Sequence, residues 1–84
     1  MNVTVKLFAT LTAHLPPADR RAGRTVAEAP AGTTVLGLIG RLRLPLQLCT
    51  LVLVNGHFVP PGDFAGKELA EGDVLAIWPP VGGG

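Results

Sequence analysis

The most chemically suggestive part of this sequence is its glycine-rich end. The last seven residues are Trp78-Pro79-Pro80-Val81-Gly82-Gly83-Gly84. Two consecutive prolines fix φ and lack backbone donors, so we expect them to end a strand and stiffen the chain after it. Glycine has no Cβ, so such an end can enter a channel that is too narrow for other residues. The reactive group is the α-carboxylate of Gly84, which is ionised at neutral pH and is a competent nucleophile towards the α-phosphate of ATP.

A glycine-rich end can also be a frayed terminus or a cloning scar without function, and glycines alone would favour that interpretation. Two observations favour a functional tail. It follows an apolar strand pattern and a Pro-Pro stop without any polar spacer. The sequence before it also fits one small fold.

Side chains elsewhere offer no comparable chemistry. Cys49 lies among leucines, and we expect an inert apolar thiol there in preference to a nucleophile. His14 and His57 have no companions at ligand spacing, so no metal site is predicted. Asp73 follows Gly72 and is most simply a turn residue. We therefore expect the chain to supply no catalytic side chain, even if it serves an enzyme as a subunit.

Composition limits the class of protein. With 84 residues, 48% of them hydrophobic and 15% charged, the sequence predicts one globular domain with apolar surface left over for a partner. The net charge is +1, and no basic stripe is interleaved with aromatics, so nucleic-acid binding is not predicted. Met1 leads directly into a strand pattern, and no apolar run reaches membrane-spanning length. A single cysteine fits the reducing cytoplasm. In the charged loop 19–23, Arg20 and Arg21 are expected to be solvated, with partner contact as the second possibility.

Alternating and continuous apolar patterns predict five strands. Val3, Val5 and Leu7 share one face of the first strand, and Asn55-Gly56 is the strongest hairpin signal in the chain. We expect residues 63–71 to be a polar connection before the last strand. The predicted strands cover residues 2–9, 24–29, 51–54, 57–59 and 74–78.

One helix is predicted between the second and third strands. Thr34 is a good N-cap, and Pro45 ends the pattern. We expect Gly37 and Gly40 to lie where this helix runs close to a sheet. Four apolar residues fall on one helical face: Val35, Leu38, Ile39 and Leu42.

The resulting order is β-β-α-β-β-β, which is an α+β chain. A right-handed crossover would place the first and last strands side by side and parallel, with the helix over one face. This is the β-grasp, or ubiquitin-like, arrangement, with a mixed sheet of about five strands packed on one main helix. We expect residues 1–81 to form that domain and residues 82–84 to form a flexible glycine tail.

Aromatic residues are predicted to form a partner-binding patch. Phe8 and Trp78 fall on the face opposite the presumed core, and Phe58 follows the hairpin. Scattered exposed aromatics are common, but clustered ones are typical of binding hot spots. The predicted partner-binding residues are Phe8, Phe58, Trp78, Pro79, Pro80 and Val81.

With these elements in place, the chain resembles the ubiquitin-like sulfur carriers, and most of all the small subunit of molybdopterin synthase. The motifs that carry the resemblance cover nearly the whole chain: Leu7-Phe8-Ala9, Thr34-Val35, Val54-Asn55-Gly56, Leu69-Ala70-Glu71-Gly72-Asp73-Val74 and the end from Trp78 to Gly84. The resemblance implies that Gly84 is adenylated and converted to a thiocarboxylate, with Gly82 and Gly83 in the same tail. It implies a ubiquitin-activating-type adenylating enzyme, which uses the ATP, and a molybdopterin synthase large subunit as partners, with no cofactor bound by this chain.

Three alternatives stay open at this point. The triple glycine and the Val-Leu-Val-Asn-Gly stretch also resemble the thiamine-pathway carrier, so the sulfur could serve thiamine or tRNA thiolation. The chain could instead be a protein modifier that is joined to lysines through Gly84. It could also be an interaction module with an inert tail.

Overall fold

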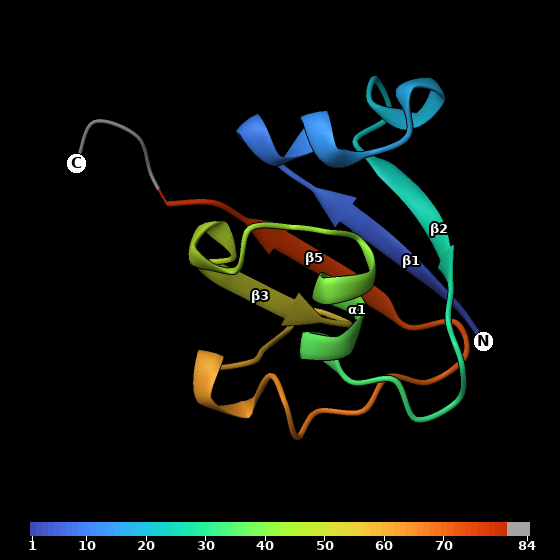
Figure 1. The fold of residues 1–84 in the computed structure, drawn as a ribbon, viewed down its shortest axis with the longest axis vertical. Coiled ribbons are helices and arrows are strands. Elements are labelled where there is room, and N and C mark those ends of the chain that lie inside the picture. The colour runs from blue at the N-terminus through green and yellow to red at the C-terminus, as the bar shows by residue number, and fades with distance from the viewer. Residues whose placement is uncertain (81–84) are drawn as a thin grey trace.

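A mixed five-stranded sheet organises the computed structural model, which describes residues 1–80 (Figure 1). The strands run in the spatial order β2-β1-β5-β3-β4. One α-helix and four short 3₁₀ helices, η1 to η4, complete the fold. Their bounds along the chain are β1 Asn2–Leu7, η1 Ala9–His14, η2 Pro17–Asp19, β2 Arg24–Glu28, α1 Val35–Arg41, η3 Leu46–Leu48, β3 Leu51–Val54, β4 His57–Phe58, η4 Pro61–Asp63 and β5 Val74–Trp78.

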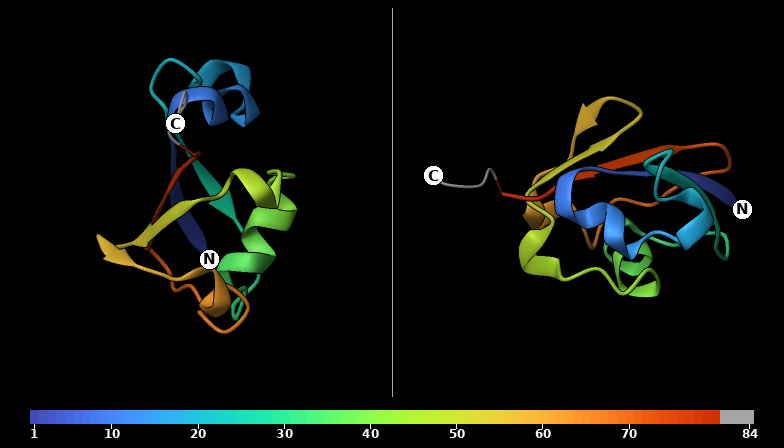
Figure 2. Two further views of the ribbon diagram at one scale, coloured as in Figure 1. Left: turned by 90° about the vertical axis from the view of Figure 1, so that its left-hand side faces the viewer. Right: turned by 90° about the horizontal axis from the view of Figure 1, so that it is seen from above.

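The first and last strands are parallel neighbours at the centre of the sheet. Val5 pairs with Leu75 and Leu7 with Ile77, whereas every other strand pair is antiparallel. Figure 2 shows α1 lying against one face of this sheet, and no helix of the described part covers the other face. The predicted β-grasp fold is confirmed.

Alternation along the strands divides the sheet into a core face and an open face. The core side chains of β1 and β5 are at most 2% exposed, and they pack against the buried face of α1. Three of the four helix residues predicted to face the sheet are fully buried, and Leu42, the C-cap, is half-buried. The main contributors are Val3, Val5, Leu7, Val35, Leu38, Ile39, Val52, Val54, Leu75 and Ile77.

The ends of two elements follow from local backbone chemistry. The Thr34 side chain accepts a hydrogen bond from the Gly37 backbone N–H at 3.1 Å, so the predicted N-cap is confirmed. β1 ends at Leu7, two residues before the predicted end, because Ala9 has a φ of +52° and opens η1. Phe8 stays extended between the two elements.

The predicted place of the two helix glycines is wrong. Gly37 and Gly40 lie on the exposed side of α1, because they are offset from the buried positions of the helical repeat. A Cβ on Gly40 would meet no atom within 4 Å, so the sheet does not approach the helix there.

The connection before β5 contributes more to the core than its polar composition predicts. Phe64 and Leu69 are 3% and 4% exposed. The backbone of this segment bonds to the start of α1, with Val35 N–H donating to the Lys67 carbonyl at 2.9 Å and Leu36 N–H to that of Phe64 at 3.0 Å. Apolar residues that occur singly in a loop have no period, so the sequence predicts only a polar connection over residues 63–71.

The helices of the described part are all short, and none of those in residues 1–80 has the length and apolar character needed to cross a membrane.

We predict that Leu38→Ala lowers the free energy of unfolding by about 2–5 kcal/mol, since it leaves a cavity under the sheet. The matched control is Leu36→Ala, two residues earlier on the same helix, where the side chain is 38% exposed. That change is expected to cost about 1 kcal/mol or less. Urea unfolding of both variants measures the difference, and equal losses would contradict the assigned buried face.

Candidate functional site

The candidate site lies at the end of the sheet where β1 and β5 both finish. Because these strands are parallel, the residues that follow them leave from the same edge. β5 ends at Trp78, and half-buried Pro79 and exposed Pro80 follow it, as expected for a Pro-Pro stop. The predicted site residues Val81, Gly82, Gly83 and Gly84 lie outside the described residues.

Phe8 and Trp78 meet at this edge. Their ring centroids are 4.1 Å apart and their planes differ by 3°, so the rings are stacked. The cause is the strand register: Leu7 pairs with Ile77, and the residues that follow them, extended Phe8 and the last β5 residue Trp78, point to the opposite, open face. Both rings are half-buried, which leaves part of the stack accessible to a partner.

Phe58 shares the open face but not the stack. It pairs with Leu53 of β3, which in turn pairs with Ala76 of β5, so one strand separates it from the strand of Trp78. Its ring is 58% exposed. The structure thus brings two of the three predicted aromatics into contact and places the third on the same apolar surface. The apolar residues of this open face are Phe8, Val26, Leu51, Leu53, Phe58, Val74, Ala76 and Trp78.

At the opposite end of β5, a polar network fixes where the strand begins. Asn55 Nδ2–H donates to Asp73 Oδ1 at 2.9 Å, and the Ala70 backbone N–H donates to Asp73 Oδ2 at 2.8 Å. The Val74 N–H donates to Asn55 Oδ1 at 2.9 Å, and the Asn55 N–H donates to the Val74 carbonyl at 2.8 Å. The hairpin turn is therefore joined to the start of β5. The sequence identified both turns, but not that their side chains meet.

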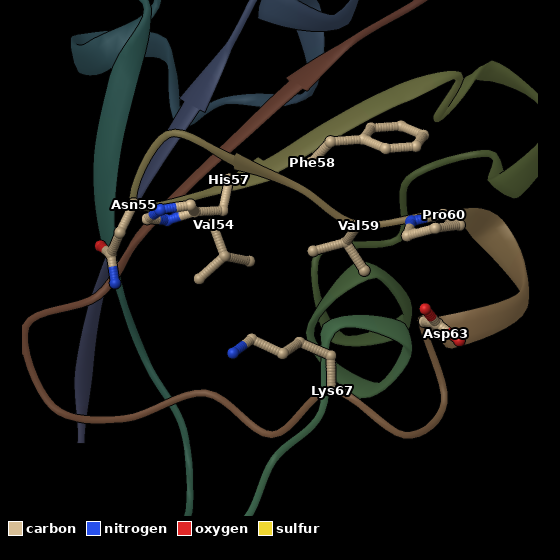
Figure 3. A pocket seen from close by; sticks show the side chains of 8 residues that line it. All are labelled: Val54, Asn55, His57, Phe58, Val59, Pro60, Asp63 and Lys67. Carbon is tan, nitrogen blue, oxygen red and sulfur yellow. The ribbon is translucent and has the colours of Figure 1, made fainter.

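The electrostatics of Asp73 follow from this network. The hydrogen bond from the Asn55 side chain, then that from the Ala70 backbone, lower the pKa of the Asp73 carboxyl below its ordinary value. The charge of Lys67 adds to this effect. In Figure 3 the Lys67 side chain extends towards the hairpin turn, across a hollow of about 270 Å³ next to β4.

The remaining candidates carry no reaction chemistry. Cys49 is 3% exposed, its Sγ lies 3.5 Å from the Pro45 carbonyl oxygen, and burial raises the pKa of its thiol. A thiol with a raised pKa is a poor nucleophile at neutral pH, which agrees with the inert role expected for it. Among residues 1–80, no three His, Cys, Asp or Glu side chains gather as metal ligands would.

Comparison with known proteins adds to this geometry. The model of the ThiS family matches residues 5–84, which includes the glycine tail. No curated protein matches the sequence. Three solved structures resemble the whole chain over their own full length: SAMP1 from Haloferax volcanii (26% identity, TM-score 0.70), the complex of subunits 1 and 2 of the molybdopterin-converting factor from Helicobacter pylori (22%, 0.63) and the thiamine biosynthesis protein ThiS from Geobacter metallireducens (19%, 0.66). At 22% and 19% identity, the last two show the fold alone.

We predict that Asp73→Asn lowers the free energy of unfolding at pH 7 by about 1 kcal/mol, because the amide cannot accept from both donors. The folded pKa of Asp73 is depressed, so its contribution is complete above the unfolded pKa of about 3.9 and is lost as the pH falls through the folded pKa. The difference between wild type and variant should therefore shrink below about pH 4. Urea unfolding across pH 2 to 7 measures it. A difference that stays constant, or one matched by the control Asp63→Asn, would contradict this role.

Proposed function

Because the chain belongs to the ThiS family of ubiquitin-like sulfur carriers, we propose that Gly84 is the residue that carries the sulfur, as a C-terminal thiocarboxylate. The observation that supports this most directly is that the family match extends through the three terminal glycines. The folded body supports it too, since β5 delivers the chain to the Pro-Pro stop beside the Phe8–Trp78 stack.

The proposed chemistry uses only the terminal carboxylate of this chain. One carboxylate oxygen of Gly84 attacks the α-phosphorus of ATP, and pyrophosphate leaves. A sulfur nucleophile then attacks the acyl carbon of the resulting acyl-adenylate, and AMP leaves with the bridging oxygen. With hydrosulfide as the nucleophile, loss of one proton gives the thiocarboxylate directly. With a persulfide as the nucleophile, a second thiol of the donor cleaves the acyl disulfide, which releases the thiocarboxylate and leaves a disulfide on the donor. ATP and the catalytic side chains belong to an adenylating partner of the ubiquitin-activating type, and this chain acts as a tethered substrate.

For the receiving pathway we propose molybdopterin synthesis, with this chain as the small subunit. The Trp78-Pro79-Pro80 motif supports it, as does the fold shared with a subunit of the molybdopterin-converting factor. That neighbour was solved as a complex of subunits 1 and 2, so a large subunit is the expected acceptor. Thiamine synthesis and tRNA thiolation are the alternatives within the same chemistry. The reducing cytoplasm is the compartment we propose for it.

A second function, protein modification, is favoured by one specific observation. The neighbour from Haloferax volcanii, at 26% and 23% identity in its two structures, is described as a small archaeal modifier protein. In a modifier, a lysine amine of another protein would take the acyl group of Gly84 in place of sulfur. Because Lys67 is the last lysine or arginine of the chain, trypsin would leave residues 68–84 on a modified lysine, and mass spectrometry of conjugates from the native cells would detect that remnant.

We predict that incubation with the adenylating partner, ATP and a sulfur donor replaces one carboxylate oxygen of Gly84 by sulfur. Intact-mass analysis should show the corresponding increase, and fragmentation should place it on the C-terminal peptide. Cys49→Ala should be modified normally, because its thiol is buried. A mass increase that maps to Cys49, or that Cys49→Ala abolishes, would contradict the proposal.

We further predict that docking and reaction can be separated. Trp78→Ala removes half of the aromatic stack and should weaken partner binding over tenfold, as for a buried aromatic anchor worth about 2 kcal/mol. Deleting Gly83 and Gly84 should largely preserve binding but stop sulfur transfer, since the chain then ends about 7 Å early.

Titration calorimetry paired with a sulfur-transfer assay measures both effects. Leu36→Ala, an apolar truncation on the helix side of the molecule, is the control for binding. Loss of binding on tail deletion alone, with normal binding by Trp78→Ala, would show that the glycines are the anchor.

A further inference from the structure

A basic hollow lies beside the aromatic stack. Its volume is about 440 Å³, and its walls come from the end of β1, the start of η1, the loop before β2 and the first residue of β2. Four of the seven Lys and Arg residues of the chain line it, and the lining includes no carboxylate. These four cations are Lys6, Arg20, Arg21 and Arg24.

The strand register places two of these cations directly opposite each other. Lys6 of β1 pairs with Arg24 of β2 on the open face. Like charges at opposed positions of an antiparallel pair destabilise a sheet. Asp19, the carboxylate of the adjoining segment, is engaged by the Thr25 hydroxyl at 2.7 Å. The lining thus holds a like-charge pair and no carboxylate to offset it. An unfavourable local arrangement of this kind is typical of a functional surface.

The hollow is continuous with the site already described. Phe8 lines it and also stacks on Trp78, so the cations border the surface that the tail leaves. We infer that this basic hollow binds an acidic segment, rich in Asp and Glu, of the adenylating partner protein that receives the tail. This inference rests on the proposed function for the identity of that partner, but not for the binding of carboxylates.

The charged side chains of the hollow suit carboxylates. Phosphate sites in loops usually present backbone N–H groups, and here the Gly23 N–H donates to the Asp19 carbonyl at 3.0 Å, while the Thr12 hydroxyl donates to that of Ala9 at 2.9 Å. The strongest donors of the lining are the charged side chains. Arg21 and Arg24 are exposed, and guanidinium forks pair with carboxylates through two parallel hydrogen bonds. Arg20 is held differently, since its Nε–H donates to the Leu15 carbonyl at 3.0 Å.

A labelled hexaglutamate peptide tests the hollow directly, by fluorescence anisotropy with the full chain at low salt. Arg21→Gln/Arg24→Gln should weaken peptide binding about three- to tenfold. The matched control is Arg41→Gln/Arg43→Gln, which removes the same net charge at two exposed arginines, the last residue of α1 and the residue after its C-cap. Equal weakening by the two pairs would overturn the inference, because it would show an effect of net charge alone. Inorganic phosphate is the competitor. If phosphate binds saturably, displaces the peptide and binds more tightly than the peptide, the hollow is a phosphate site and the inference is overturned.

The partner assay separates this inference from the proposed function. With the adenylating partner, Arg21→Gln/Arg24→Gln should raise the KM for thiocarboxylate formation and leave kcat unchanged. The difference in KM should vanish at about 0.5 M salt, where screening shortens the Debye length below about 5 Å. An unchanged KM at low salt would contradict the inference even if sulfur is transferred. The wild-type chain could fail to be thiocarboxylated while Arg21→Gln/Arg24→Gln still weakens peptide binding more than the control pair does. In that case the proposed function fails and the acidic-segment site stands.

Stability gives an independent readout. Arg24→Gln removes the repulsion with Lys6, so its midpoint of thermal unfolding should equal or exceed that of the wild type. A lower midpoint would show that Arg24 serves the fold, and would overturn the inference that these cations are kept for binding.

Discussion

The pairing of the first strand with the last is the interaction on which the rest of the molecule depends. β1 and β5 are parallel, adjacent and central, and α1 covers the core face that they form. Parallel neighbours require a crossover, and here everything between residues 8 and 73 forms that connection. Because the two strands end at the same edge, the residue after β1 stacks on the last residue of β5. The aromatic stack is thus a direct consequence of the register that builds the core.

The features that the sequence predicted correctly are those that depend on residues close together in the chain. The Asn55-Gly56 turn is a two-residue device, and its φ values of +51° and +82° are those that a type I′ hairpin needs. The buried face of α1 follows from a period of 3.6 residues. Both depend on neighbours within one or two turns, so both are readable without knowing the fold. The same holds for the N-cap at Thr34.

Contacts between distant segments were not predictable in this way. The Asn55–Asp73 hydrogen bond joins residues 18 positions apart, and the opposition of Lys6 and Arg24 depends on how two strands align. Phe64 is buried although its loop has no apolar period. In the candidate site, alternation put Phe8 and Trp78 on one face, but their contact required the parallel register and Phe58 proved to stand apart.

The two ends of β5 use polar groups in opposite ways. At its start, carboxylate, amide and backbone groups are matched to one another, and they fix the strand. At its finish, the cations of the basic hollow meet no carboxylate in its lining. A surface whose charges are already paired gives little to a partner, because separating those pairs offsets what binding gains. The network at the start of β5 fixes the position of the strand, and the cations at its end remain available to a partner. Both properties suit a chain that presents its terminus to another protein.

A sulfur carrier on the proposed model binds one enzyme, reacts there, leaves and binds a second, so its affinity for each has an upper limit. Charges and aromatic contact contribute to this cycle at different ranges. Exposed charges act over about 10 Å at 0.1 M salt and mainly raise the rate of encounter, whereas a stacked aromatic acts only on contact and mainly lowers the rate of release. Phe8 and Trp78 are half-buried, so a partner can contact only part of their stack, which limits how strongly this contact holds it. The neighbouring cations then compensate at the encounter step, which allows the same short tail to be delivered quickly to successive partners without being held by any of them.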